Sequence, residues 1–393
     1  MKMSKKIKNP NILTLKESRE IIKSNLKEMK RLEKIKREKR TPDQFTTVMN
    51  SNDNVVEIED LETFFYTDNG VVRSVNKISF DVPKNSIVGL VGESGCGKSV
   101  TSLSIMQLVQ APQGQVVGGQ IRFNSGELGQ DDEGRDRCYD VTKMPTLDMC
   151  RIRGKDISMI FQEPMTSLNP VFTVGYQIEE VFYLNNPEAT KEQAHAKAIE
   201  MLTMVGIPMP ETIINYYPHQ LSGGMRQRVM IAIALTGNPK LIIADEPTTA
   251  LDVTIQSQIL KLLKKVQREC QASIMLITHD LGVVAEMADY VVVMYAGKIV
   301  EKGTVYEIFD NPMHPYTMGI QKAKPSLASD SGNELYSIPG NVPNPINIPD
   351  ECLFKGRCAE RCADCEGKCY PKEIKITPTH SVFCHKYDKG GES

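Results

Sequence analysis

The feature that most constrains the fold is a glycine-rich segment between an apolar run and a helical pattern. The segment reads Gly92-Glu93-Ser94-Gly95-Cys96-Gly97-Lys98-Ser99 and fits G-x-x-x-x-G-K-[ST]. Residues 87–91 before it predict a buried strand, and residues 100–108 after it predict a helix. A chance Gly-rich turn is the alternative, but the strand–loop–helix order is the setting in which such a loop binds phosphate.

In a P-loop of this kind, backbone N–H groups and the positive end of the following helix surround phosphate oxygens. The pattern therefore predicts an ATP site over residues 92–100, in which Val100 begins the helix. Lys98 is expected to meet the β- and γ-phosphate oxygens, and the Ser99 hydroxyl to bind Mg²⁺. Cys96 occupies a variable position of the loop and is interpreted as a small side chain only.

Two carboxylates follow a second apolar run, residues 241–244. A nucleoside triphosphatase needs one carboxylate to hold Mg²⁺ through water and another to polarise the attacking water. We assign these roles to Asp245 and Glu246, with a simple strand cap as the alternative. His279 follows the apolar run 274–277 and can contact the γ-phosphate, although a solvated loop histidine would look the same. Together these residues predict ATP hydrolysis rather than ATP binding alone.

Strands that alternate with helices indicate an α/β fold with a parallel sheet. Residues 241–245 and 273–278 predict buried strands separated by a helix at 255–270, and residues 164–237 have a helical pattern. A β-rich stretch begins at Val55 and continues through residues 71–82. We interpret residues 41–54 as a polar linker, 126–148 as an acidic surface loop and 339–349 as an extended segment. Without an internal repeat, the chain contains one ATPase unit.

The net charge of −2 hides a strongly basic N-terminus, because residues 1–40 hold 15 Lys and Arg against 5 Glu. Residues 14–40 lack Gly and Pro and predict a charged amphipathic helix. Such a helix could bind an anionic membrane or nucleic acid, with a solvated helix or a disordered arm as the simpler reading. No secretory signal and no membrane-length apolar run is recognised, which favours a cytosolic location.

Residues 221–228 resemble the signature of the ABC ATPases; they read Leu221-Ser222-Gly223-Gly224-Met225-Arg226-Gln227-Arg228. Gln162 resembles that family's Q-loop residue, residues 250–252 its D-loop, and His279 its switch histidine. The resemblance implies a P-loop ATPase core with an antiparallel β subdomain and a helical subdomain. It also implies that Gln162 serves catalysis and Mg²⁺ binding.

By the same resemblance, Ser222, Gly223 and Gly224 contact ATP that is bound to the P-loop of a second subunit. An aromatic residue near the first strand is expected to stack on the adenine. Phe65 is our assignment for this residue, and Tyr66 is the near alternative.

A closer resemblance, over about residues 55–385, is to the oligopeptide/dipeptide import ATPases. It is carried by residues 161–170, 244–254 and 314–317 and by the C-terminal region. It implies a second ATPase subunit, in a heterodimer or homodimer, two membrane permease subunits and an extracytoplasmic substrate-binding protein. The chain would then lie peripherally on the cytoplasmic face of the cell membrane. Peptides are favoured as cargo, with nickel or glycosides as alternatives.

The domains expected from these patterns are a basic extension (1–50), an ABC ATPase domain (51–312) and a Cys-rich C-terminal extension (313–393). The alternative function is a soluble ABC ATPase acting on nucleic acid or ribosomes. Relatives of that class usually carry two ATPase units or an insertion within the domain. Here one unit is present and the cysteines follow it, so no nucleic-acid partner is expected.

Six of the ten cysteines lie between residues 352 and 384. In a chain without a secretory signal this indicates thiols or metal ligands rather than disulfides. The family resemblance implies an iron–sulfur site on Cys352, Cys358, Cys365 and Cys384, whereas spacing alone does not choose between [4Fe–4S], Zn²⁺ and free thiols. Cys362 and Cys369 are surplus to that pattern. Since the ATP motifs end before Ile308, we expect loss of a metal from this segment to leave nucleotide binding by the P-loop largely intact.

Overall fold

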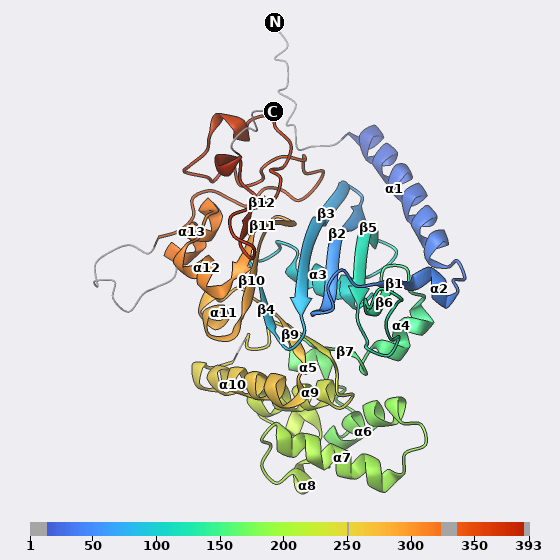
Figure 1. The fold of residues 1–393 in the computed structure, drawn as a ribbon. Helices are drawn as coiled ribbons and strands as arrows, with labels where there is room; N and C mark the ends of the chain where they lie inside the picture. The colour runs from blue at the N-terminus through green and yellow to red at the C-terminus, as the bar shows by residue number, and fades with distance from the viewer. Residues whose placement is uncertain (1–13, 250, 324–335, 389–393) are drawn as a thin grey trace, which may run out of the picture.

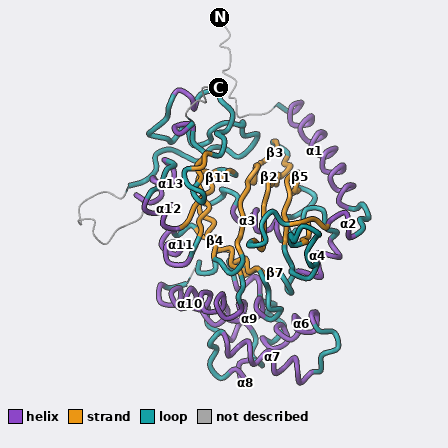
Figure 2. The backbone as a smooth tube through the Cα atoms, in the orientation of Figure 1, coloured by secondary structure: helices purple, strands orange, loops and turns teal. Residues whose placement is uncertain are grey.

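Two β-sheets form the centre of the protein, and a group of helices lies below them in the computed structural model (Figure 1). The structure describes residues 14–249, 251–323 and 336–388. Within them, one sheet has eight strands in the order β12-β13-β11-β10-β4-β9-β8-β7, and the other has five in the order β1-β6-β5-β2-β3. Figure 2 shows the separation of the strands from the helical part.

The eight-stranded sheet contains the predicted parallel arrangement. Its strands are β4 (Ile87–Val91), β7 (Ile157–Ile160), β8 (Leu241–Asp245), β9 (Ser273–Thr278), β10 (Tyr290–Tyr295), β11 (Lys298–Thr304), β12 (Ile374–Lys375) and β13 (Ser381–Val382). The neighbours β10, β4, β9, β8 and β7 are all parallel. Every residue of β4, β7, β8 and β9 is buried, as expected for strands covered on both faces. The predicted strands at 87–91, 241–245 and 273–278 are confirmed.

Alternate residues of these strands belong to two hydrophobic cores. Ile87 and Val91 of β4 pack into the first core with α9 (Gly223–Leu235), α10 (Val253–Cys270) and α11 (Leu281–Met287). Val88 and Leu90 pack into the second core, which also includes side chains from the five-stranded sheet. The alternation of side chains along a strand thus joins the two sheets and the helices into one body.

The five-stranded sheet is antiparallel and corrects two expectations. It consists of β1 (Thr46–Val48), β2 (Asn54–Thr67), β3 (Gly70–Pro83), β5 (Gly114–Phe123) and β6 (Arg137–Asp140). The predictions of a linker at 41–54 and of a surface loop at 126–148 are wrong. Strand β1 lies in the first segment and β6 in the second, and the two strands pair with each other. Short helices α2 (Pro42–Phe45) and α4 (Thr146–Ile152) flank them. A few buried apolar side chains, including Met49 and Cys138, fix these polar segments to the core.

The predicted helical middle of the chain is confirmed. It consists of α5 (Pro164–Ser167), α6 (Val174–Asn185), α7 (Lys191–Met204), α8 (Pro210–Ile213), the 3-10 helix η1 (Pro218–Gln220) and α9. The P-loop helix is α3 (Lys98–Ile105), which begins two residues before the expected start at Val100 and ends three residues before the expected end at residue 108. In the described part of the chain, no helix combines the length and apolarity needed to cross a membrane.

The predicted N-terminal helix is α1 (Leu15–Lys36), and it begins with a capping box between Thr14 and Glu17. It packs along the five-stranded sheet rather than standing free (Figure 1). The side-chain amide of buried Asn25 donates to the carbonyl of Thr67 at 2.8 Å. These contacts exclude the disordered-arm interpretation for residues 14–36, while residues 1–13 lie outside the described part.

The C-terminal extension is joined to the ATPase sheet by backbone and side-chain bonds. It includes α13 (Pro315–Lys322) and the 3-10 helices η2 (Ala363–Cys365) and η3 (His385–Tyr387), and α12 (Val305–Asp310) comes just before it. Strand β13 pairs with β11. Glu301 of β11 is fully buried and accepts the backbone N–H groups of Met313 and His314 at 2.7 and 2.9 Å. Its carboxylate also contacts His380 Nε2 at 2.8 Å.

We predict that His314 makes the stability of the protein fall at acidic pH. This residue caps α13 by accepting the Tyr316 N–H at 3.0 Å. Burial lowers the pKa of His314 to about 4 from 6.5, although Glu301 and Glu360 oppose this. Because the unfolded chain takes up the proton at higher pH, the stability is complete above 6.5 and falls as the pH drops toward 4. The free energy of unfolding should lose about 3 kcal/mol from this group over that range.

Urea titrations of wild type and His314→Asn at both ends of the range measure this loss. Asparagine keeps a capping oxygen but does not titrate, so the variant should lose correspondingly less stability in acid. His195→Asn, at an exposed position, should behave like wild type. The same acid-induced loss in His314→Asn as in wild type would contradict the assignment.

Candidate active site

The predicted ATP-binding and catalytic residues follow the carboxyl ends of four parallel strands. The P-loop follows β4, Gln162 follows β7, Glu246 follows β8 and His279 follows β9. The parallel registers bring these ends to one edge of the sheet. Open α/β sheets bind ligands at this edge, so the topology alone makes it the candidate active site.

Two glycines of the P-loop, Gly92 and Gly97, have no room for a side chain. Gly97 has φ +106°, and a Cβ there would lie 2.2 Å from the carbonyl oxygen of Ser74. Lys98 Nζ donates to the carbonyls of Gly92 and Glu93 at 2.8 and 3.1 Å. The lysine is 5% exposed. Its ammonium group thus already lies inside the loop, where phosphate oxygens could replace the carbonyls as acceptors.

The two residues predicted to bind Mg²⁺ at the end of the loop and the end of β8 are adjacent. Ser99 Oγ donates to Asp245 Oδ1 at 3.1 Å. Burial raises the pKa of Asp245, and the Ser99 hydrogen bond works against that shift. A hydroxyl and a carboxylate are oxygen ligands of the kind that Mg²⁺ prefers. The pair therefore fits the cation that accompanies ATP.

The three predicted catalytic side chains meet at Glu246. Its Oε2 accepts from Gln162 Nε2 at 3.1 Å, and its Oε1 lies 3.2 Å from His279 Nδ1. Glu246 has φ +46°, and its N–H donates to the carbonyl of Ile277 at 2.8 Å. Such a backbone is uncommon for a non-glycine residue and is maintained here by the neighbouring strand. The carboxylate is oriented by both partners.

Thr249 is a site residue that the sequence analysis missed. Its hydroxyl donates to Glu246 Oε2 at 2.9 Å. It stands three residues after the glutamate, within the family-like segment 244–254, but no local pattern indicates a role for it. The hydrogen bond adds a third partner that orients the same carboxylate.

The signature residues lie in the helical part of the protein. Ser222 caps α9, accepting the Met225 N–H at 3.3 Å, and a Cβ on Gly223 would meet nothing within 4 Å. Helix α9 packs on α5, α6, α7 and β7. Ser222, Gly223 and Gly224 are thus not brought into the cluster around Glu246. Of the predicted D-loop, Asp252 caps α10 through the Ile255 N–H at 2.9 Å, and Ala250 lies outside the described residues.

The two candidates for adenine stacking differ in their surroundings. The ring of Phe65 lies against β5, where a Cβ on Gly114 would be 2.7 Å from it. Tyr66 is 9% exposed, and its pKa is raised by burial and by the nearby Glu28 of α1. Because Tyr66 is covered, Phe65 is the better candidate. The stacking of Phe65 on adenine stays a prediction.

No disulfide joins any of the ten cysteines, all of which lie in the described residues. Burial raises the pKa of Cys384 to about 11, and Cys352, Cys358 and Cys365 contribute to the shift, so the four predicted ligands share one region. Sγ of Cys362 lies 3.4 Å from that of Cys365. Among the described residues, no group of three or more His, Cys, Asp or Glu side chains is arranged to hold a metal ion.

The C-terminal extension contacts the P-loop directly, although the ATP motifs end before Ile308 in the sequence. Arg357 forms an ion pair with Glu93, with NH1 and Oε2 2.7 Å apart. The hydroxyl of Tyr316 accepts the N–H of Glu93 at 2.9 Å. Residues that are 223 and 264 positions away in sequence therefore touch the loop. Tyr316 lies in the family-like segment 314–317 and Arg357 in the family-like C-terminal region, and neither segment by itself indicates a contact with the P-loop.

Two family models match the chain. The model described as "ABC transporter" matches residues 75–249, and "Oligopeptide/dipeptide transporter, C-terminal region" matches residues 300–365. The oligopeptide transport ATP-binding protein AppD of Bacillus subtilis is 47% identical over 86% of this chain and 98% of its own length. OppD of the same organism, also an oligopeptide transport ATP-binding protein, is 48% identical over 84% of this chain and 87% of its own length.

A solved structure is similar in fold. It is the dimeric post-hydrolysis state of the ATP-binding cassette MJ0796 bound to ADP and Pi, with a TM-score of 0.53 and 25% identity. The match covers 64% of this chain and 98% of that one. The ATP-binding cassette architecture expected from the motifs is therefore confirmed.

The geometry around Glu246 predicts that Glu246→Gln binds ATP but loses hydrolysis. Glutamine keeps a similar shape and a hydrogen-bonding oxygen, yet it cannot accept the proton from water, which should cost roughly 10²- to 10⁴-fold in kcat. Lys98→Ala should instead weaken ATP binding. Nucleotide titration and steady-state ATPase assays separate the two effects, and hydrolysis by Glu246→Gln at the wild-type rate would overturn the assignment of the base.

Proposed function

The chain belongs to the ABC transporter ATP-binding proteins of the oligopeptide/dipeptide family, and on this premise we propose that it hydrolyses ATP to energise a peptide importer. The observation that carries the proposal is the single cluster of P-loop, Asp245, Glu246, Gln162 and His279 at the sheet edge. It is joined to the matched C-terminal region of peptide transporters. The relatives' names supply the cargo class.

In this proposal each residue of the cluster has a separate task. Lys98 exchanges its carbonyl acceptors for β- and γ-phosphate oxygens. Ser99, Asp245 and Gln162 would hold Mg²⁺, which would supply positive charge beside the phosphates. Glu246, oriented by Gln162, Thr249 and His279, accepts a proton from the attacking water. Phosphoryl transfer depends mainly on such positioning and charge stabilisation.

The site is proposed to be completed by a second ATPase subunit, identical or different. Ser222, Gly223 and Gly224 present a helix N-terminus whose free donors suit phosphate, yet they lie away from their own P-loop. The dimeric state of the structurally similar cassette supports this arrangement. Each signature would then close over ATP bound to the partner.

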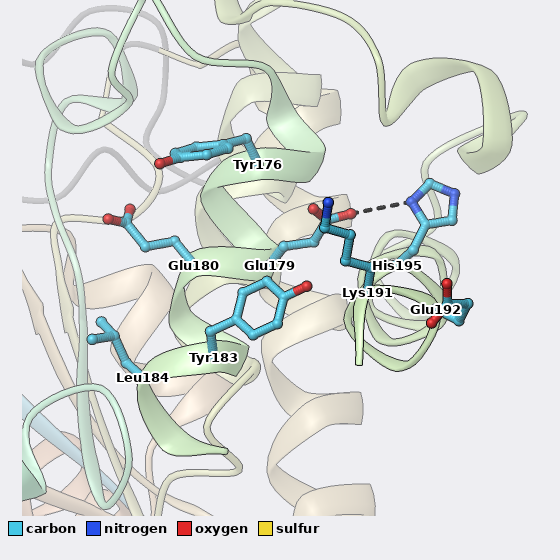
Figure 3. A pocket seen from close by; sticks show the side chains of 8 residues that line it. All are labelled: Tyr176, Glu179, Glu180, Tyr183, Leu184, Lys191, Glu192 and His195. Atoms are coloured by element: carbon cyan, nitrogen blue, oxygen red, sulfur yellow. Dashed lines mark hydrogen bonds and ion pairs between the residues drawn. The ribbon is translucent and has the colours of Figure 1, made fainter. Parts of the chain in front are cut away.

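The surface around α6 is proposed to receive the membrane permeases. Apolar side chains on α6 and just before it are exposed, among them Val171 at 70% and Leu184 at 76%. A pocket of about 820 Å³ lies beside them, lined by Tyr176, Glu179, Glu180, Tyr183, Leu184, Lys191, Glu192 and His195 (Figure 3). A hydrogen bond of 3.1 Å between Glu179 and His195 holds α6 to α7 there. An apolar surface with a polar rim is typical of a protein interface.

Assembly with two permeases and an extracytoplasmic binding protein would place the chain on the cytoplasmic face of the membrane. The binding protein and the permeases would select the peptide. The alternative, an ATPase acting on nucleic acid or ribosomes, was based on the basic N-terminus. Its described part, α1, is docked on the sheet by Asn25 and Glu33 rather than presented as a free arm.

We also propose that Cys352, Cys358, Cys365 and Cys384 bind a metal, with [4Fe–4S] favoured over Zn²⁺. The support is the donor set, four thiols that lie close enough together to raise one another's pKa. The described side chains would have to turn toward a common centre to ligate it. A bound metal would stabilise this segment, whose regular structure is limited to short helices and two-residue strands.

The import function predicts that peptide controls hydrolysis in the assembled transporter. Copurified permeases and binding protein, reconstituted in lipid, should hydrolyse ATP faster when peptide is added. Gly223→Asp should remove this activity while the isolated chain still binds nucleotide, because residue 223 has open space on its own chain. Stimulation by RNA or DNA but not by peptide would favour the alternative function.

The metal proposal predicts that anaerobically purified protein is brown and contains iron and sulfide. Serine at any of the four ligand positions should remove the colour, and Cys369→Ser, at an exposed thiol, should not. Metal analysis is the measurement. Stoichiometric zinc without iron would contradict the cluster in favour of Zn²⁺, and the absence of both metals would leave free thiols.

A further inference from the structure

The P-loop residue Glu93 is held by the C-terminal extension through both its side chain and its backbone. Arg357 NH1 and NH2 donate to the two carboxylate oxygens of Glu93 at 2.7 and 3.1 Å. The Glu93 N–H donates to Tyr316 Oη at 2.9 Å. Lys98 Nζ in turn donates to the Glu93 carbonyl at 3.1 Å. One loop residue thus connects the extension to the lysine expected to bind phosphate.

The Arg357 side chain is itself held in place by contacts other than the one with Glu93. It is 8% exposed and also donates to the carbonyls of Ile338 and Pro339 at 3.3 and 3.1 Å. Its guanidinium lies 5.8 Å from the ring centre of Tyr295. A planar guanidinium that donates two hydrogen bonds to one carboxylate fixes the orientation of that carboxylate as well as its distance. Lysine could supply the charge but not this geometry.

Tyr316 is held by aromatic packing. It is fully buried, and its ring centre is 4.8 Å from that of Tyr295 and 5.5 Å from that of Phe354. Tyr295 ends β10, whereas Tyr316 and Phe354 belong to the extension. The hydroxyl that meets the P-loop is therefore carried by a rigid cluster that spans the sheet and the extension.

The extension also forms part of the wall beside the nucleotide site. A cavity of about 600 Å³ is lined by Gly92 and Glu93 of the loop, by His279, and by Tyr336 and Arg357 of the extension. Residues expected to meet the γ-phosphate and residues of the extension thus face the same space.

We propose that Arg357 and Tyr316 are positioning residues of the ATPase. They hold Glu93 so that the start of the P-loop keeps the backbone conformation that binds phosphate. They do not touch the reacting atoms. Their effect is transmitted through the Glu93 backbone to Lys98. Because the assignment presupposes ATP binding by the P-loop, it rests on the proposed function, but it does not depend on peptide as cargo.

The test is ATP affinity of the full chain, measured by titration with a fluorescent ATP analogue, together with KM and kcat in the assembled complex. Arg357→Ala should raise Kd and KM about tenfold with a much smaller change in kcat, as the loss of a charged two-point hydrogen bond implies. Arg357→Lys should recover only part of the affinity. Tyr316→Phe removes one hydroxyl without disturbing the ring cluster and should raise Kd in the same direction.

A matched control is Lys355→Ala, which removes ion pairs with Glu351 and Glu366 in the same extension without contacting the loop. It should leave Kd and KM at their wild-type values. Wild-type Kd in both Arg357→Ala and Tyr316→Phe would overturn the proposal. Failure of the wild-type chain itself to bind ATP would instead overturn the proposed function. A fall in thermal stability with no change in Kd or KM would show a merely structural contact and would also overturn it.

Discussion

The constraint on which the structure depends is the parallel pairing of β4, β7, β8 and β9. Parallel strands all end at the same edge, so chemical groups more than 180 positions apart in sequence can share one site. A strand register shifted by one residue would turn its buried side chains to the other core and would move the terminal carboxylates as well. The fully buried strands make that shift costly, and the position of Glu246 therefore follows from core packing.

Close backbone approach is the second requirement of the site. The P-loop passes so near β3 and β10 that Gly92 and Gly97 have no room for a side chain. Glu246 keeps a left-handed backbone because its N–H is bonded to the end of β9. The site is rigid where the loop and strands meet. The contact of Glu93 with Arg357 extends that rigidity to the C-terminal segment, so the cysteine-rich region is continuous with the ATPase in structure.

Local patterns predicted most of the core and the candidate site, because the P-loop, the buried strands and the Asp245–Glu246 pair are contiguous in sequence. Contacts between distant segments were not predictable in this way. Glu93 and Arg357 are 264 positions apart, and each is an ordinary charged residue in its own surroundings. The paired strands β1 and β6 have three and four residues, too few for a clear alternation. Helix α1 was recognised by its pattern, but its docking depends on contacts of Asn25 and Glu33 with strands distant in sequence.

Accumulation of labelled peptide in proteoliposomes tests the central claim most directly. The vesicles would contain this chain with its permeases, with binding protein and peptide on one side and ATP on the other. Peptide should accumulate against its gradient only when Mg²⁺ and hydrolysable ATP are present on the side of this chain. Accumulation should cease with a non-hydrolysable ATP analogue. Hydrolysis of ATP by the same vesicles without any peptide accumulation would contradict the account.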